Sequence, residues 1–170
     1  YDYNPEKAKK LLTEAGYPNG FETPFLAYRN RDYAEAMINN LNAVGITAKF
    51  EYLKYAAFRD KVQSGGAPFN FGTWGSYSIN DVSAITSHFQ SGGKDDYSKD
   101  PEVIKQLGIG DTSVDANVRK AAYKAALSRI SGEAFMFPLW SYNTWYAFSK
   151  DVDFNPTPDE IPRFFTAKWM

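Results

Sequence analysis

The sequence predicts an α/β protein in which a mixed sheet carries helices on both faces. The first observation is that short apolar or alternating segments interleave with segments of helical periodicity between residues 23 and 74. The second is that the resulting β-α-β-α-β order fits crossovers between parallel strands, which are almost always right-handed and place helices on the sheet faces. The third is the length: 170 residues can bury an ordinary core, and one domain is the default.

A short amphipathic helix is predicted at the start of the chain. Asn4 can cap its N-terminus, and Pro5 suits the first helical position. Gly16 fits the left-handed position after the last turn. One face of this helix is apolar at helical spacing, and it consists of Ala8, Leu11, Leu12 and Ala15.

The first strand and its crossover helix follow. Residues 23–28 form a short apolar run typical of a strand, and residues 31–44 are predicted to be helical. Asp32 and Glu35 have the spacing of a capping box. The predicted buried stripe of this helix is Ala34, Met37, Ile38 and Leu41.

The sequence also predicts a second crossover, in which a helix connects the second and third strands. Residues 46–53 alternate as in a strand with one covered face, and residues 55–63 are predicted to form a helix that ends at Ser64-Gly65-Gly66. Residues 69–74 are the third predicted strand.

The second half of the chain is less regular. Helices are predicted over residues 81–89, 101–107 and 114–130, and a polar surface loop over residues 92–96. Residues 135–140 and 144–149 have the pattern of two strands. Arg119 and Tyr123 lie four residues apart on the longest helix, which predicts a structural contact between them.

Composition excludes several classes of function. The net charge of −1 argues against nucleic acid as a partner. The absence of cysteine excludes disulfides, thiol catalysis and cysteine-bound zinc. No apolar run is long enough to span a bilayer, and no signal peptide is present, so we expect a processed protein or an excised piece of one.

The sequence lacks the sets of residues that catalytic and metal-binding sites need, so we predict no enzymatic activity, no cofactor and no metal. His88 is the only histidine, and we expect it to be a surface or half-buried side chain, because no G-x-S-x-G elbow accompanies it. Residues 96–102 alternate as calcium ligands would, but Pro101 stands where an EF-hand needs glycine. A solvated acidic loop is the preferred interpretation.

Candidate binding residues lie where the predicted parallel strands end, because ligands of open α/β sheets bind beyond the carboxyl ends of the strands. These positions are Arg29-Asn30, Lys54-Tyr55 and the loop from Trp74 to Asp81. The loop offers an aromatic face, hydroxyls, an amide and a carboxylate. The alternative is a solvated loop that caps the next helix through Asn80 or Asp81.

Five segments, in order, resemble the family 5 extracellular solute-binding proteins of ABC importers. Residues 3–21 resemble Y-D-P-E-K-A-K-K-L-L-x-E-A-G-Y-P-x-G-F, with Asn4 in place of the usual Asp. Gly72-Thr73-Trp74-Gly75 resembles the family's G-W-G strand end. Weaker matches are residues 97–103, 115–123 and 134–139.

The resemblance implies a binding role for specific residues of this chain. The loop residues would line a cleft, and Tyr142 and Trp145 lie on a strand pair that approaches the cleft in the family. Tyr77 stands where the family usually has an acid, which leaves Asp81 as the only carboxylate nearby. The expected ligand-binding residues are Arg29, Asn30, Trp74, Gly75, Ser76, Tyr77, Ser78, Asp81, Tyr142 and Trp145.

The resemblance also implies an architecture and a setting. Residues 1–150 would form the C-terminal lobe of a type II periplasmic-binding-protein-like fold, and residues 151–170 would return to a missing N-terminal lobe. The whole protein would capture a peptide or similar small polar solute between two lobes and deliver it to an ABC permease. It would be periplasmic or extracellular, with a lipid anchor at the missing N-terminus as one arrangement. The alternative is a stand-alone protein-interaction domain that uses exposed aromatic side chains.

Overall fold

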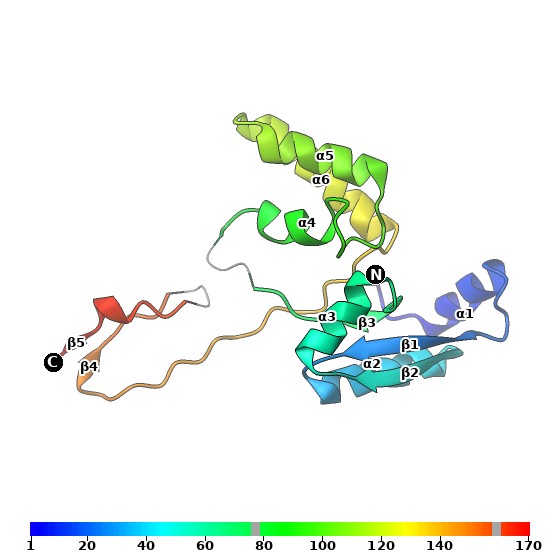
Figure 1. The fold of residues 1–170 in the computed structure, drawn as a ribbon, viewed down its shortest axis with the longest axis horizontal. Coiled ribbons are helices and arrows are strands. Elements are labelled where there is room, and N and C mark those ends of the chain that lie inside the picture. The colour runs from blue at the N-terminus through cyan, green and yellow to red at the C-terminus, as the bar shows by residue number, and fades with distance from the viewer. Residues whose placement is uncertain (76–78, 158–160) are drawn as a thin grey trace. The chain divides into compact units, whose positions relative to one another are not determined.

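The computed structural model describes residues 1–75, 79–157 and 161–170. The chain divides into two compact units, Tyr1–Thr73 and Trp74–Met170, each of which is described by itself (Figure 1). Unit 1 contains a parallel sheet flanked by helices, and the described part of unit 2 contains three α-helices, a short 3-10 helix and a small antiparallel C-terminal hairpin.

The sheet of unit 1 has three parallel strands in the order β2-β1-β3. These strands are β1 (Phe21–Ala27), β2 (Ile46–Tyr52) and β3 (Asn70–Phe71). Phe21 pairs with Ile46, and Leu26 pairs with Asn70. The predicted α/β class is confirmed, while the sheet of unit 1 is purely parallel and antiparallel pairing is confined to unit 2. The third strand is shorter than predicted.

Helices cover both faces of this sheet, as predicted (Figure 1). Phe25 and Ala27 point to one face, where they pack in a cluster that includes residues of α2 (Arg31–Ala43). Leu26 points to the other face and packs in a cluster with residues of α3 (Tyr55–Gln63). All three side chains are 0–1% exposed, so β1 is buried on both faces, as expected of a central parallel strand.

The N-terminal helix α1 (Pro5–Glu14) matches its prediction closely. Asn4 Oδ1 accepts a hydrogen bond of 2.8 Å from the backbone N–H of Lys7, and Gly16 adopts the left-handed conformation with φ +88°. No residue of α1 is buried, and Leu11 is 52% exposed. The apolar face of α1 is therefore only partly covered, with Ala8 and Leu12 half-buried and Leu11 and Ala15 exposed.

The capping box predicted for α2 is wrong. The N-cap position is held by Asn30 in the left-handed conformation (φ 51°), and its side chain makes no capping hydrogen bond. Glu35 instead accepts a 2.7 Å hydrogen bond from Nε of Arg31. Because this ion pair engages the Glu35 carboxylate, Glu35 does not cap the backbone at the start of the helix.

Unit 2 contains α4 (Ser83–Phe89), α5 (Pro101–Thr112) and α6 (Ala116–Gly132). The last two helices pack together around a buried cluster of Val103, Leu107, Tyr123, Ala126 and Ile130. Asp100 and Asp115 cap them through two backbone N–H groups each. Helix α5 continues past the predicted end at Leu107, because Gly108 and Gly110 are accommodated inside it.

The loop before α5 is not simply a solvated acidic segment, and that interpretation is wrong at Asp96. This residue is 1% exposed. Its carboxylate accepts hydrogen bonds from the backbone N–H groups of Gly92 and Lys99 and from the hydroxyl of Ser98. The loop is therefore organised around a buried carboxylate.

The two strands predicted over residues 135–140 and 144–149 are wrong, since both segments lack regular secondary structure. Neither segment pairs with a strand among the residues that the structure describes. The strands of unit 2 are the antiparallel pair β4 (Val152–Asp153) and β5 (Lys168–Trp169), with a short 3-10 helix (Phe164–Thr166) before β5.

Candidate functional site

The ends of the three parallel strands in unit 1 meet at one edge of the sheet. Because β1 pairs in parallel with both neighbours, the residues after each strand emerge on the same side. These residues are Tyr28 to Asn30 after β1, Leu53 and Lys54 after β2, and Gly72 and Thr73 after β3. The convergence of strand ends that the sequence predicts is present in this unit.

Polar and aromatic contacts tie these strand ends together. The hydroxyl oxygens of Tyr28 and Thr73 are 3.1 Å apart, and Nη1 of Arg29 donates a 3.1 Å hydrogen bond to the Thr73 hydroxyl. The ring of Tyr28 also lies 5.0 Å from that of Tyr55 and 4.8 Å from that of Phe58 on α3. We call Tyr28, Arg29, Tyr55 and Thr73 the strand-end cluster.

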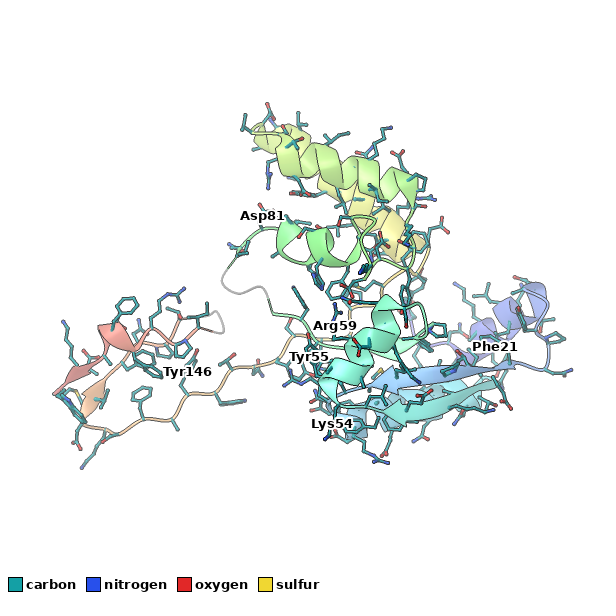
Figure 2. All side chains as sticks on the ribbon, in the orientation of Figure 1. Phe21, Lys54, Tyr55, Arg59, Asp81 and Tyr146 are labelled. Carbon is teal, nitrogen blue, oxygen red and sulfur yellow. The ribbon has the colours of Figure 1, made fainter. Side chains whose placement is uncertain are left out.

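The strand-end cluster and the neighbouring Lys54 present cationic and aromatic groups to solvent. Arg29 and Lys54 are exposed, and Tyr55 is 56% exposed at the first turn of α3 (Figure 2). A guanidinium and an ammonium group can bind carboxylates, and phenol rings can cover apolar parts of a solute. Tyr28 and Thr73 were missed by sequence reasoning, because each was counted as a strand residue and not as part of a strand end.

The loop after β3 begins at Trp74 in unit 2, where its indole packs on α4. The ring is stacked on that of His88 at 4.2 Å, and its Nε1–H donates a 3.1 Å hydrogen bond to the carbonyl of Ala84. Trp74 is still 37% exposed, and Ile79 is 53% exposed, so the described ends of the loop are open to solvent. Gly75 is half-buried. The predicted site residues Ser76, Tyr77 and Ser78 lie outside the described residues.

Asp81 is held by protein donors at the other end of this loop (Figure 2). Its Oδ1 accepts hydrogen bonds from the backbone N–H of Ser83 (3.0 Å) and the hydroxyl of Tyr123 (3.3 Å), and its Oδ2 accepts one from Arg119. The hydrogen bonds from Ser83 and the charge of Arg119 lower the pKa of this carboxyl. Asp81 is thus an anchor of the loop as well as its predicted carboxylate.

Arg119 and Tyr123 make the contact that their spacing predicts. The guanidinium carbon of Arg119 lies 5.1 Å from the centre of the Tyr123 ring. The Tyr123 hydroxyl also donates a 2.7 Å hydrogen bond to Asp111. Burial, followed by the hydrogen bond and charge of Asp111, raises the pKa of Tyr123 to about 12. Together with Asp81 and Asp111, these residues form a compact polar network on the α5–α6 pair.

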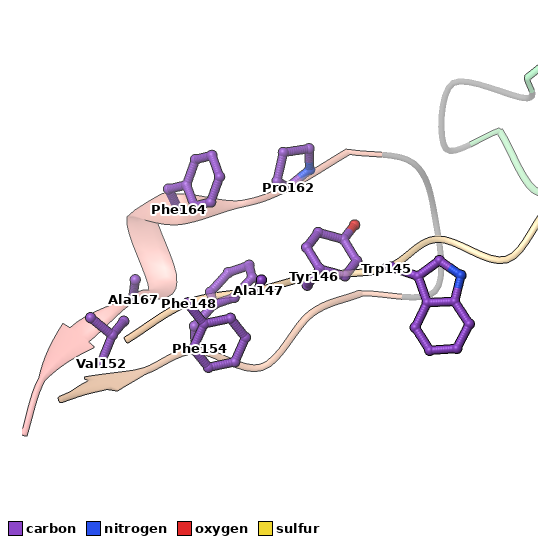
Figure 3. A pocket seen from close by; sticks show the side chains of 9 residues that line it. All are labelled: Trp145, Tyr146, Ala147, Phe148, Val152, Phe154, Pro162, Phe164 and Ala167. Atoms are coloured by element: carbon purple, nitrogen blue, oxygen red, sulfur yellow. The ribbon is translucent and has the colours of Figure 1, made fainter. Parts of the chain in front are cut away.

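The remaining predicted residues lie in the segment that leads to the C-terminal hairpin. Tyr142 is 51% exposed, and its ring meets that of Trp140 edge-on at 6.2 Å. Trp145 is 88% exposed and lies at the rim of an apolar cavity of about 490 Å³ (Figure 3). Phe154 is the buried member of this cavity's lining, packed against Tyr146, Phe148 and Phe164.

The predicted ligand-binding residues therefore fall into three groups. Arg29 and Asn30 lie at the strand ends of unit 1, Trp74, Gly75 and Asp81 lie around the loop that opens unit 2, and Tyr142 and Trp145 lie near its end. Across the described ranges, no three histidine, cysteine or acidic side chains are placed to hold a metal ion. Within those ranges, no helix has the length and apolarity needed to cross a bilayer.

Comparison with known proteins finds one family and several relatives. The model of the bacterial extracellular solute-binding proteins, family 5 Middle, matches residues 1–96. Heme-binding protein A of Haemophilus influenzae is 80% identical over 25 residues, which are 15% of this chain and 5% of that protein. The glutathione-binding protein GsiB of Escherichia coli K12 is 42% identical over 53 residues, or 29% of this chain and 10% of that protein.

A solved structure extends the similarity over the whole chain. The dipeptide-binding protein of Pseudoalteromonas sp. SM9913, in complex with Met-Leu, is 25% identical with a TM-score of 0.81. The match covers 99% of this chain and 36% of that protein. This chain therefore corresponds to about a third of the structural relative and to a tenth or less of the two curated relatives named above.

Proposed function

This chain belongs to the bacterial extracellular solute-binding proteins of family 5, and from that premise we propose that it is part of the solute-capturing subunit of an ABC importer. The proposed solute is a peptide or a similar small polar molecule. In this proposal residues 1–150 act as one lobe, and residues 151–170 return to an N-terminal lobe. The whole protein would close over its solute by hinge motion and deliver it to a membrane permease.

One observation carries the proposal, namely the strand-end cluster at the carboxyl edge of the parallel sheet. Tyr28, Arg29 and Thr73 come from the ends of β1 and β3, and Tyr55 comes from the start of α3, which follows β2. These residues are joined by hydrogen bonds and ring contacts. Open α/β sheets bind ligands at this edge. Two of the three relatives described above support the solute class, because their names describe binding of glutathione and of a dipeptide, whereas the third is named for binding heme. Membership of the family disfavours the alternative of a stand-alone interaction domain.

We propose a specific role for each group of site residues. The Arg29 guanidinium would bind a carboxylate of the solute, and the backbone turn at Asn30 would hold Arg29 at the edge of the sheet. Trp74, with Gly75 to Ser78, would contact the solute by stacking and hydrogen bonding. Asp81 would support this loop, while Tyr142 and Trp145 would add aromatic contacts. No covalent step is part of the proposal.

The setting of the whole protein is also a proposal. Proteins of this family are extracellular by description, and we place this one in the periplasm or outside the cell. A lipid anchor at the N-terminus of the whole protein is one arrangement that would keep it near its permease. Mass spectrometry of the intact protein from its own cell envelope would detect such an anchor as an added acyl mass.

Calorimetric titration of this chain with short peptides tests the half-site idea. We expect no Kd tighter than about a micromolar, because one lobe supplies only part of the contacts. A nanomolar Kd would contradict the proposal that a second lobe completes the site. Ligand that co-purifies with the whole protein, identified by native mass spectrometry, would give the solute.

The role of Arg29 is tested in the whole protein with the ligand so identified. Arg29→Ala should weaken binding roughly tenfold or more, because a hydrogen bond to a charged group contributes about 1.5–3 kcal/mol. Lys49→Ala is the matched control, because Lys49 is an exposed cation of the same unit that pairs with Glu22. Equal affinities of the Arg29 and Lys49 variants would exclude Arg29 from the site.

A further inference from the structure

We propose that His88 is a positioning residue that holds Trp74 in a proton-dependent stack, with Asp95 as its charged partner. We call Trp74, His88 and Asp95 the indole stack. All three residues lie in unit 2. The stack itself does not depend on the proposed function. Only the statement that Trp74 would face the solute rests on that function.

The geometry of Trp74 shows that α4 holds its side chain on several sides. The His88 ring lies parallel to the indole, with a centroid separation of 4.2 Å and an interplanar angle of 21°. The Phe89 ring meets the indole edge-on at 5.1 Å and the imidazole edge-on at 4.6 Å. The indole N–H bonds the carbonyl of Ala84 at 3.1 Å. Contacts made by one short helix therefore contribute to the orientation of Trp74.

Asp95 connects this stack to the protonation state of the imidazole. His88 Nε2 lies 3.3 Å from Oδ2 of Asp95, whose side chain is only 8% exposed. His88 Nε2 and Asp95 Oδ1 are both shielded from solvent. A proton gained by His88 would create an ion pair with Asp95 in this shielded setting. The same proton would place a cation on the face of the indole, where it is attracted by the π system.

Other charged groups near α4 have contacts of their own. Helix α5 also packs against α4, and it carries Glu102, Lys105 and Asp111. Glu102 contacts Lys105 and Gln106, while Asp111 accepts from Tyr123. On the loop after α4, Asp96 accepts three hydrogen bonds from that loop, and Lys94 and Lys99 are exposed. Among the charged side chains that the structure describes, Asp95 lies within ion-pair distance of His88.

Protonation of His88 should therefore favour the stacked position of Trp74. At low pH the imidazolium adds a cation–π contact and an ion pair to the stack, and at high pH both contributions are lost. Contacts of this kind at partly exposed sites shift a two-state equilibrium roughly two- to fivefold. Histidine is the residue suited to such a role, because its charge ordinarily changes between about pH 5 and pH 8. The aromatic wall proposed for the solute would become more rigid on acidification.

Fluorescence of this 170-residue chain tests the proposal without any solute. The contribution of Trp74 is the emission of the wild-type chain minus that of Trp74→Phe, which removes the background of the other three tryptophans. We expect its acrylamide quenching constant to fall between about pH 8 and pH 5, by no more than the roughly two- to fivefold shift of the stacking equilibrium, because the stacked indole is still partly exposed. His88→Phe keeps an aromatic ring under the indole but cannot bind a proton, and it should abolish this pH dependence. Asp95→Asn should reduce it.

Each outcome bears on the proposal separately from the proposed function. A Trp74 signal that is constant with pH, or one that responds equally in His88→Phe, would overturn the indole stack. Far-UV circular dichroism of each variant verifies that the helices are retained, and the single histidine gives one NMR signal that reports its titration directly. If the pH response is present but Trp74→Phe leaves solute binding by the whole protein unchanged, then the stack is retained and the solute role of Trp74 is refuted.

Discussion

Replacing Gly110 by alanine should destabilise the α5–α6 pair, although alanine is the better helix former. A Cβ atom added at Gly110 would lie 2.6 Å from Cε1 and 2.8 Å from Cδ1 of Tyr123. Non-bonded carbon atoms prefer about 3.5–4.0 Å, so the overlap is roughly 1 Å. The ring cannot easily retreat, because its hydroxyl is bonded to Asp111 and Asp81 and the residue is only 6% exposed.

The magnitude follows from two opposing contributions. Overpacking of a well-packed core costs about 1–3 kcal/mol. The change from glycine to alanine in a helix interior stabilises by about 1 kcal/mol. Gly108→Ala is the matched control, because Gly108 lies on the same helix and nothing lies within 4 Å of an added Cβ. Gly110→Ala should therefore be less stable than Gly108→Ala by about 1–3 kcal/mol.

Urea unfolding followed by far-UV circular dichroism measures the difference as a shift in midpoint at constant slope. The penalty of Gly110→Ala should disappear in a Tyr123→Ala background, which is the double-mutant test of this contact. Equal midpoints for the two single variants would refute the reasoning, because they would mean that the Tyr123 ring moves aside at no cost.

Three further predictions concern unit 2 and the exposed helix of unit 1. Leu107→Ala should cost about 2–5 kcal/mol in urea unfolding, because Leu107 is 2% exposed in the core, whereas Leu11→Ala on the exposed face of α1 should cost under about 0.5 kcal/mol. The hydrogen bond from Arg129 is the main cause that lowers the pKa of Asp100 to about 2. The ionised Asp100 therefore contributes its full stability above the unfolded pKa near 3.8, and this contribution is lost as the pH falls towards 2. The urea unfolding midpoints of wild type and Arg129→Gln should converge between these two pH values. The pKa of Tyr123 is raised to about 12, so the stability that this residue contributes is full below about pH 10 and is lost as the pH rises towards 12. Titration followed by ultraviolet absorbance should show one tyrosine that ionises at higher pH than the others, and this step should be missing in Tyr123→Phe.

Local signals were sufficient for much of unit 1. The cap at Asn4 and the left-handed Gly16 define α1, and α3 spans the residues predicted for it. The convergence of the strand ends was also predictable, because it follows from the connections between parallel strands. These features depend on near neighbours in the sequence or on general topology, and not on particular distant partners.

Features that depend on distant partners were missed. The helix predicted over residues 101–107 continues to Thr112 as α5, where Gly110 fits closely against Tyr123 on α6. Asp96 looked like a solvated residue, yet it is the buried centre of its loop. The segments between residues 135 and 149 have strand composition, but they pair with none of the strands in the described part of the chain.

The candidate site shows the same division. Arg29 could be placed from the end of a predicted strand, whereas its bond to Thr73 joins residues that only folding brings together. The stacking of His88 on Trp74 likewise had no signal in the sequence beyond the aromatic character of both residues.

The burial of β1 on both faces has a consequence for how unit 1 forms. Leu26 and Phe25 serve opposite hydrophobic clusters, and their strand partners, β2 and β3, lie much later in the chain. During synthesis β1 emerges from the ribosome well before either neighbour. Its two apolar faces therefore stay exposed to solvent until residues near Asn70 have been made. Synthesis of the intervening residues takes on the order of seconds, so nascent chains should be most prone to aggregate, and most dependent on chaperones, in that interval.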